Sequence, residues 1–205
     1  MAAEVEQLAA RIDRIKEIME LATEYKLLPD WSAIIGGTLV LISTAITYSM
    51  TRSWDVAAVF RLDVKHFCLV AGLWSGTVLA SILLYYVIAL RDAKRLGVSL
   101  ESRPSQLARR AMGPALFAAA VVTTKLLLDN TLGYLPGVWI LGYGVALVNA
   151  GLFSTVAPRV LGLLFIAVGT VAILLLQRYD LALTALSFGV FHVGFGWYVL
   201  SKKNG

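Results

Sequence analysis

Residues 137–200 read GVWILGYGVALVNAGLFSTVAPRVLGLLFIAVGTVAILLLQRYDLALTALSFGVFHVGFGWYVL, and this stretch decides the fold. It contains three apolar runs, each close to the roughly 20 residues that a helix needs to cross the hydrocarbon core of a bilayer. The runs are residues 137–154, 159–177 and 181–200. Links of only a few residues separate them, so consecutive runs must form antiparallel neighbouring helices.

Three further apolar runs precede this stretch, at residues 31–50, 67–90 and 111–133. None of the six alternates with period two, and each is too long for a barrel strand. The sequence therefore predicts an all-α polytopic membrane protein. We expect a six-transmembrane-helix bundle over residues 31–200 with a cytoplasmic loop at 91–110, preceded by an N-terminal amphipathic cytoplasmic helix at 1–30.

Composition supports the membrane class. The chain has 205 residues, of which 59% are hydrophobic and 15% charged, and its mean hydropathy is +0.77. A soluble domain has about 45–50% apolar and about 25% charged residues. These values exclude a water-soluble globular fold, a disordered chain and a fibrous one. The single cysteine, Cys68, excludes a disulfide framework and a CxxC site.

The distribution of positive charge predicts the orientation. With the N-terminus inside, thirteen Lys and Arg residues lie on the inner side and four on the outer side. Loops rich in Lys and Arg remain in the cytoplasm. We therefore expect both termini to be cytoplasmic, in the cell (inner) membrane, with the lipid bilayer as the surroundings of the bundle.

The N-terminal segment carries an a/d heptad seam formed by Val5, Leu8, Ile12, Ile15 and Met19. Such a stripe can lie on a membrane surface, pair with a second copy, or dock onto a partner or the cytoplasmic loop. Through Asp30 the segment has seven acidic and four basic residues, and anionic lipid attracts basic helices. This balance favours helix–helix association, so the seam is the predicted binding face for a protein partner or a homo-oligomer.

Small residues at four-residue spacing mark two predicted spans. Gly72, Gly76 and Ala80 share one face of the second span, and Gly142, Ala146 and Ala150 share one face of the fourth. Faces of this kind let helix backbones approach closely in lipid. We expect both to serve packing within the bundle rather than a homodimer interface.

Ionisable residues within the spans are few. Lys125 and Asp129 lie four residues apart on one helix face and can form an ion pair, with Asn130 beside them. One interpretation is a vestibule for an ion or small polar ligand. The other, which we favour, is a lysine that extends to the headgroups beside an interfacial carboxylate.

His192 lies near the middle of the sixth span and is the one candidate for cofactor binding. A haem held between two histidines is excluded, because His66 differs in depth by about half the bilayer. The favoured alternative is a neutral histidine bonded to a neighbouring helix, with Asn149 as a possible companion. No metal and no cofactor are therefore predicted.

Sequence features of enzymes are missing. The chain has no P-loop, HExxH, GxSxG or GxGxxG motif and no pair of carboxylates on one intramembrane face, so we expect no catalytic residues and no enzyme. The pI of 9.4 reflects the inner loops, and nucleic acid is not an expected partner. The sequence favours an accessory, structural or interaction subunit of a membrane assembly. The alternative is a small transporter or channel for an ion or small polar solute.

Overall fold

The computed structural model describes residues 6–8, 11–12, 30–97, 103–175 and 177–204. Within these residues it contains six helices that are long and apolar enough to span a membrane. The first five are α2 (Trp31–Thr51), α3 (Val64–Leu96), α4 (Arg103–Leu128), α5 (Leu135–Ala150) and α6 (Val156–Leu174). The sixth is made of α7 (Asp180–Thr184), the π-helical segment η4 (Ala185–Phe191) and α8 (His192–Asn204). An all-helical chain of this kind is compatible with a multi-pass membrane protein.

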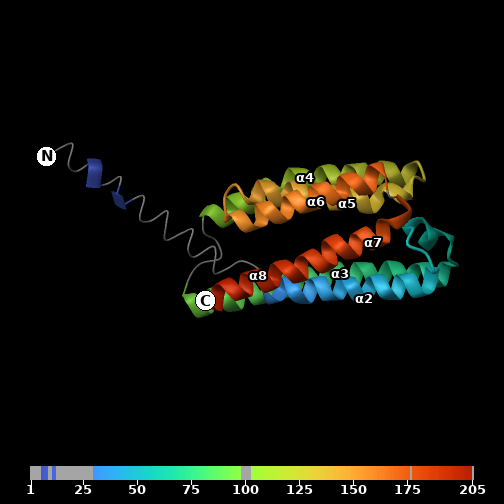
Figure 1. Cartoon of the computed structure of the whole chain (residues 1–205), viewed down its shortest axis with the longest axis horizontal. Helices are drawn as coiled ribbons and strands as arrows, with labels where there is room; N and C mark the ends of the chain where they lie inside the picture. The colour runs from blue at the N-terminus through green and yellow to red at the C-terminus, as the bar shows by residue number, and fades with distance from the viewer. Residues whose placement is uncertain (1–5, 9–10, 13–29, 98–102, 176, 205) are drawn as a thin grey trace.

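The helices form two groups of three (Figure 1). One group contains α4, α5 and α6, in which α5 packs against both of its neighbours. The other contains α2, α3 and α8, in which α2 is the central helix. The sixth span joins the groups: α7 contacts α5 and α6, and the chain then runs along α2 as η4 and α8.

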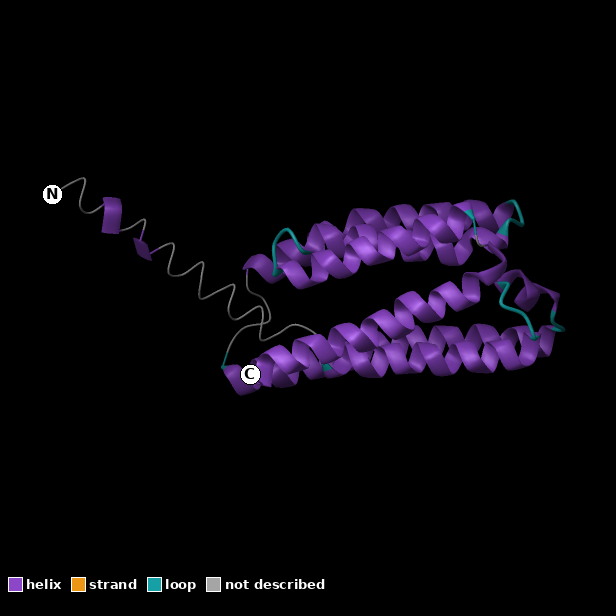
Figure 2. Ribbon diagram, in the orientation of Figure 1, coloured by secondary structure: helices purple, strands orange, loops and turns teal. Residues whose placement is uncertain are grey.

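Three short 3₁₀ turns gather at one end of the bundle, which we call the far end. They are η1 (Val56–Arg61), η2 (Leu132–Tyr134) and η3 (Gln177–Tyr179), and η2 contacts the other two. The opposite end, which we call the terminal end, contains the start of α2 and the end of α8. Every described segment is helix or a short connection, as Figure 2 shows.

Helix continues into most of the predicted loop at residues 91–110. The helix α3 extends to Leu96, and Gly97 ends it in the left-handed conformation with φ of 63°. The helix α4 already begins at Arg103. Arginine and lysine are good helix formers, so a basic segment beside an apolar run extends the helix beyond the bilayer-length core.

Glycines bring α5 and α6 into close contact. A Cβ added at Gly144 would lie 2.8 Å from the Gly162 carbonyl oxygen, and one added at Gly162 would lie 2.7 Å from the Gly144 carbonyl oxygen. Gly169 approaches the backbone of Leu141 in the same way. Because only hydrogen fits at these positions, the two backbones pack directly. Beside this seam Ile140, Leu161 and Phe165 form the buried core.

The two predicted small-residue faces have different outcomes. In the fourth span the prediction is confirmed: a Cβ on Gly142 would lie 2.9 Å from Cβ of Ala119 on α4, and Ala146 and Ala150 are buried. In the second span it is wrong, because Gly72 and Gly76 are exposed and an added Cβ would have no neighbour within 4 Å. The reason is that α3 packs on α2 through its other side.

Candidate functional site

The sixth span changes helix type in its middle. Between α7 and α8 the seven residues of η4 are π-helical, and two of them, Ser187 and Gly189, are buried. A Cβ added at Gly189 would lie 2.5 Å from the Leu41 side chain, so α2 passes very close to this turn. Single π turns inside α-helices are rare and frequently occur at functional sites. This interruption is therefore the first component of a candidate site.

His192 follows the π-helical segment directly and faces the other helix group. Its Nε2 lies 3.1 Å from the hydroxyl of Tyr143 on α5, and its Nδ1 lies 3.4 Å from the Ser187 carbonyl oxygen. The rings of Tyr143, Phe165, Phe188, Phe191 and His192 form what we call the aromatic cluster, with ring centroids 5.1–6.0 Å apart. The cluster draws on α5, α6, η4 and α8, so it joins the two groups.

Tyr143, and not Asn149, is the companion of His192. Asn149 instead donates from Nδ2 to the carbonyl oxygen of Ala111, at 3.4 Å. The expected bond between His192 and a neighbouring helix is thus present, with a different partner. Within the described residues no group of three His, Cys, Asp or Glu side chains is placed to hold a metal ion.

Hydroxyl groups line the contact between α2 and α3. Ser43 Oγ lies 2.7 Å from Thr77 Oγ1, and Trp74 Nε1 donates to Thr47 Oγ1 at 3.0 Å. Ser81 continues this hydroxyl seam by donating to the Thr77 carbonyl oxygen. Side-chain hydrogen bonds of this kind hold helices together in lipid.

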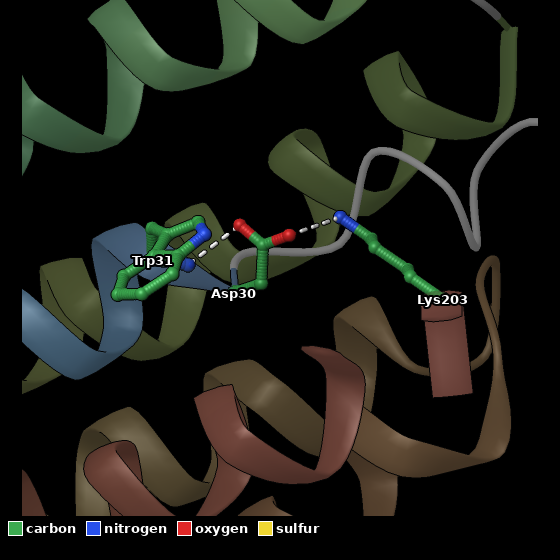
Figure 3. A network of polar contacts seen from close by, with 3 residues as sticks. All are labelled: Asp30, Trp31 and Lys203. Carbon is green, nitrogen blue, oxygen red and sulfur yellow. Dashed lines mark hydrogen bonds and ion pairs between the residues drawn. The ribbon is translucent and has the colours of Figure 1, made fainter. Parts of the chain in front are cut away.

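A buried ion pair closes the terminal end. Lys203 Nζ lies 2.9 Å from Asp30 Oδ2, and the other carboxylate oxygen of Asp30 accepts the backbone N–H of Trp31 (Figure 3). Asp30 is the N-cap of α2, and Lys203 belongs to the last turn of α8. The pair therefore ties the beginning of the first span to the end of the sixth. A carboxylate at a helix N-terminus and a lysine at a helix C-terminus are each favoured there by the helix dipole.

A buried carboxylate organises the far end. Asp180 is 1% exposed, and its Oδ1 accepts the backbone N–H groups of Val56 and Leu181, each at 2.8 Å. The Leu181 N–H also lies 3.0 Å from the Trp54 carbonyl oxygen. These contacts fasten the α2–α3 connection to the start of the sixth span. The second carboxylate oxygen, Oδ2, is buried and has no hydrogen-bond partner.

Next to this network, at the N-cap of α3, Asp63 is bonded to His66. The hydrogen bond from the imidazole holds the pKa of the Asp63 carboxyl below its usual value. Both side chains are exposed, so the pair belongs to the surface.

The residues of the predicted vestibule are all exposed. Lys125 Nζ and Asp129 Oδ1 form the expected ion pair at 2.6 Å, with side chains 70% and 44% exposed. Asn130 lies just beyond α4 in the left-handed conformation, with φ of 55°, where asparagine commonly ends a helix. The structure thus brings two of the three together and gives Asn130 a helix-ending role.

The predicted partner-binding face lies largely outside the described residues. Of its five members, Val5, Ile15 and Met19 are not described. Leu8 and Ile12 are helical and are 61% and 59% exposed.

Three features of the site were not predicted from the sequence, and only one of them, the hydroxyl seam, left a signal there. Ser43, Thr47 and Thr51 recur every four residues, as do Thr77 and Ser81, which places hydroxyls on one face of each helix. Tyr143 had no such signal, because its role depends on a contact with a distant span. Asp180 looked like an ordinary loop residue, since burial by a distant turn leaves no local pattern.

The described part of the chain is helical, with six apolar helices of which the last is interrupted by a π-helical segment. No family model, no curated protein and no solved structure matches this chain.

Proposed function

We propose that this chain is an accessory or interaction subunit of a membrane assembly, with no enzymatic activity of its own. The observation that carries the proposal is the outer face of α3. Gly72 and Gly76 are exposed there, and an added Cβ would meet nothing within 4 Å. A face of small residues that the bundle leaves open is suited to the close approach of another transmembrane helix.

The packing of α3 explains why this face is available. The hydrogen-bonded side chains of Trp74 and Thr77 face α2, and Ser81 lies against Gly36 of the same helix. Each residue of an α-helix is rotated by about 100° from the one before it, and this rotation places Gly72 and Gly76 on the side of α3 that faces away from α2. Lateral contacts of α3 with the rest of the bundle come mainly from α2.

The N-terminal seam is the second element of the proposal. Leu8 and Ile12 are large, helical and exposed, so their apolar surface is free for a partner helix. Burying a side chain of this size contributes about 1.5–3 kcal/mol before ordering costs. Pairing there with a protein partner or a second copy would add to the contact made by α3.

The test is the assembled mass of the full-length protein in mild detergent. We expect Gly72→Leu with Gly76→Leu to reduce association while the protein remains folded, because leucine prevents close helix approach. Gly194→Leu is the matched control, since a Cβ at Gly194 also meets nothing within 4 Å. Unchanged mass in the α3 variant and in an Ile12→Glu, Ile15→Glu variant would refute the proposal.

The proposal includes an orientation with both termini in the cytoplasm of the cell membrane. It rests on the thirteen-to-four distribution of Lys and Arg between the two sides. Cys68, an exposed residue near the far end, should react with an impermeant maleimide from outside the cell. In a Cys68→Ser background, Ser105→Cys at the start of α4 should react only after the membrane is opened. The reverse pattern would invert the topology.

A second candidate function is a small transporter or channel, and the interrupted sixth span favours it. Transporters commonly place substrate at discontinuous helices near the bilayer midplane. Here η4 is followed by His192, which bonds to Tyr143 of the other helix group. Proteoliposomes with a pH-sensitive dye inside test this function for protons. Flux that is lost in His192→Leu supports it, and flux equal to that of empty liposomes argues against it.

A further inference from the structure

The far end contains two carboxylates, Asp55 and Asp180, that accept hydrogen bonds from the same helical turn. Asp180 Oδ1 accepts the backbone N–H of Val56 at 2.8 Å. Asp55 Oδ1 accepts the next N–H along the chain, that of Ala57, at 2.7 Å. Because both side chains bond to the first turn of η1, two negative groups lie close together at one point of the bundle.

Neither carboxylate has a cationic partner. Among the described residues, the ion pairs are made by other side chains, and Arg52, Arg61 and Arg178 near this end are exposed without reaching Asp55 or Asp180. The helix α2, which runs up to this connection, contains no charged residue. The two carboxyl groups are thus neighbours without a cation between them, and ionising both is unfavourable in a desolvated setting.

The orphan oxygen of Asp180 points to a ligand. Its Oδ2 is buried without a hydrogen-bond donor in a side chain that is 1% exposed. The other buried carboxylate, Asp30, provides the contrast, because Lys203 pairs with its Oδ2. A buried polar atom without a partner needs an explanation, and an ion is one of the standard ones.

We propose that Asp55 and Asp180 bind a hard cation at the far end of the bundle. Carboxylate oxygens are the ligands that Na⁺, Mg²⁺ and Ca²⁺ prefer, and backbone carbonyls or water complete their coordination. The Trp54 carbonyl lies in the same network, where it accepts the Leu181 N–H at 3.0 Å. Because the proposed side-chain ligands are two carboxylates, without a thiol or an imidazole, a transition metal is disfavoured.

Binding at this point has a mechanical consequence. The α2–α3 connection is held to the sixth span through Asp180, so a cation between the two carboxylates strengthens a link between the helix group of α2 and the start of α7. The inference does not depend on the proposed partner contact, which lies on α3 and the N-terminal segment. The two ideas can therefore fail separately.

The test uses the full-length protein in detergent, with unfolding followed by tryptophan fluorescence. Chelated protein is compared in choline chloride, NaCl, MgCl₂ and CaCl₂ at constant ionic strength. At roughly ten times its Kd, the bound cation should raise Tm by about 3–6 °C. The arm that produces the rise identifies the cation.

Three variants make the result specific. Asp180→Asn and Asp55→Asn each keep an oxygen that can accept the backbone N–H, so the protein should fold while the cation-dependent rise disappears. Asp63→Asn is the control, because it removes a carboxylate from the same end that is exposed and already bonded to His66. It should retain the full rise.

Two outcomes would overturn the proposal. One is that no cation raises Tm of the native chain above the choline value. The other is that Tm depends on pH alone, with Asp180→Asn as stable at neutral pH as the native chain is at acidic pH, which would mean that Oδ2 carries a proton instead of facing a metal ion.

Discussion

Two antiparallel helix pairs in this bundle are held together by opposite means. The pair α5–α6 packs backbone against backbone at Gly144 and Gly162, and it encloses the apolar core around Phe165. The pair α2–α3 packs through hydroxyl groups, with Ser43 bonded to Thr77 and Trp74 to Thr47. In a bilayer, where lipid competes with any apolar contact, both close approach and hydrogen bonding stabilise helix pairs.

The two helix pairs should therefore differ in the substitutions that they tolerate. A close glycine contact leaves no space for an added atom, because that atom would collide with backbone that cannot move without separating the helices. A hydroxyl contact is a set of modest, individually replaceable bonds. We therefore expect single substitutions to have large effects in α5–α6 and small ones in α2–α3.

The largest effect should come from Gly162→Ala. Its new methyl group would lie 2.7 Å from the Gly144 carbonyl oxygen and 2.8 Å from the Val148 backbone nitrogen. Overpacking costs about 1–3 kcal/mol, and we expect the upper end because the obstacles are backbone atoms. The measurement is the free energy of unfolding in mixed micelles titrated with SDS.

Gly72→Ala on α3 is the matched control for that change. The added methyl group there has nothing within 4 Å, and alanine is the better helix former by about 1 kcal/mol in water. We expect unchanged or slightly increased stability. Equal losses in Gly162→Ala and Gly72→Ala would contradict the close-approach explanation, because the methyl group added at Gly72 meets nothing within 4 Å.

A smaller effect is expected where the two groups meet. Tyr143→Phe removes the hydroxyl that lies 3.1 Å from His192 Nε2 but keeps the ring in the aromatic cluster. Loss of one side-chain hydrogen bond within a membrane bundle costs about 0.6–1.7 kcal/mol. The same SDS titration measures it.

A double-mutant cycle with His192→Phe supplies the control for Tyr143→Phe. If the bond is what matters, the cost of Tyr143→Phe should fall to nearly zero in the His192→Phe background. A full cost in that background would attribute the effect to ring packing.

The positions of the apolar helices could be predicted from the sequence, but the faces that they bury could not. Hydropathy is a property of each segment alone, so the six apolar helices were predictable from runs such as 137–154. Which face of a helix is covered depends on partners distant in sequence. The same spacing pattern predicted that Gly142 and Gly76 both pack inside the bundle. That prediction was right for Gly142 and wrong for Gly76.

The candidate site was predictable only in part, for the same reason. His192 was recognisable as a polar residue in an apolar span, but its bond to Tyr143 spans 49 positions in sequence. The buried Asp180 accepts a hydrogen bond from Val56, 124 positions away. The π-helical turn at Ala185–Phe191 has no glycine or proline pattern that separates it from an ordinary helix.

A modest effect is expected from removing the hydroxyl pair of the α2–α3 contact. Ser43→Ala leaves the buried Thr77 hydroxyl without its 2.7 Å partner, whereas Ser43→Ala with Thr77→Val removes both groups. We expect the single change to cost about 0.5–1.5 kcal/mol and the double change to cost less. A double change that costs the sum of both single changes would show that each hydroxyl acts alone and that the bond between them contributes nothing.

The smallest effect should be that of Lys125→Met. The lysine pairs with Asp129 at 2.6 Å, but 70% of its side chain is exposed, and pairs of this kind four residues apart on a helix contribute about 0.3–0.5 kcal/mol. Methionine keeps the apolar stem and removes only the ammonium group, so α4 should stay folded with an unfolding free energy close to that of the native chain. SDS titration measures the change, and Asp129→Asn, which breaks the same pair from the other side, should match it. If Lys125→Met alone abolished folding, or abolished a transport activity that Asp129→Asn left intact, the lysine would belong to a functional vestibule and the contrast between replaceable polar contacts and irreplaceable glycine contacts would not extend to α4.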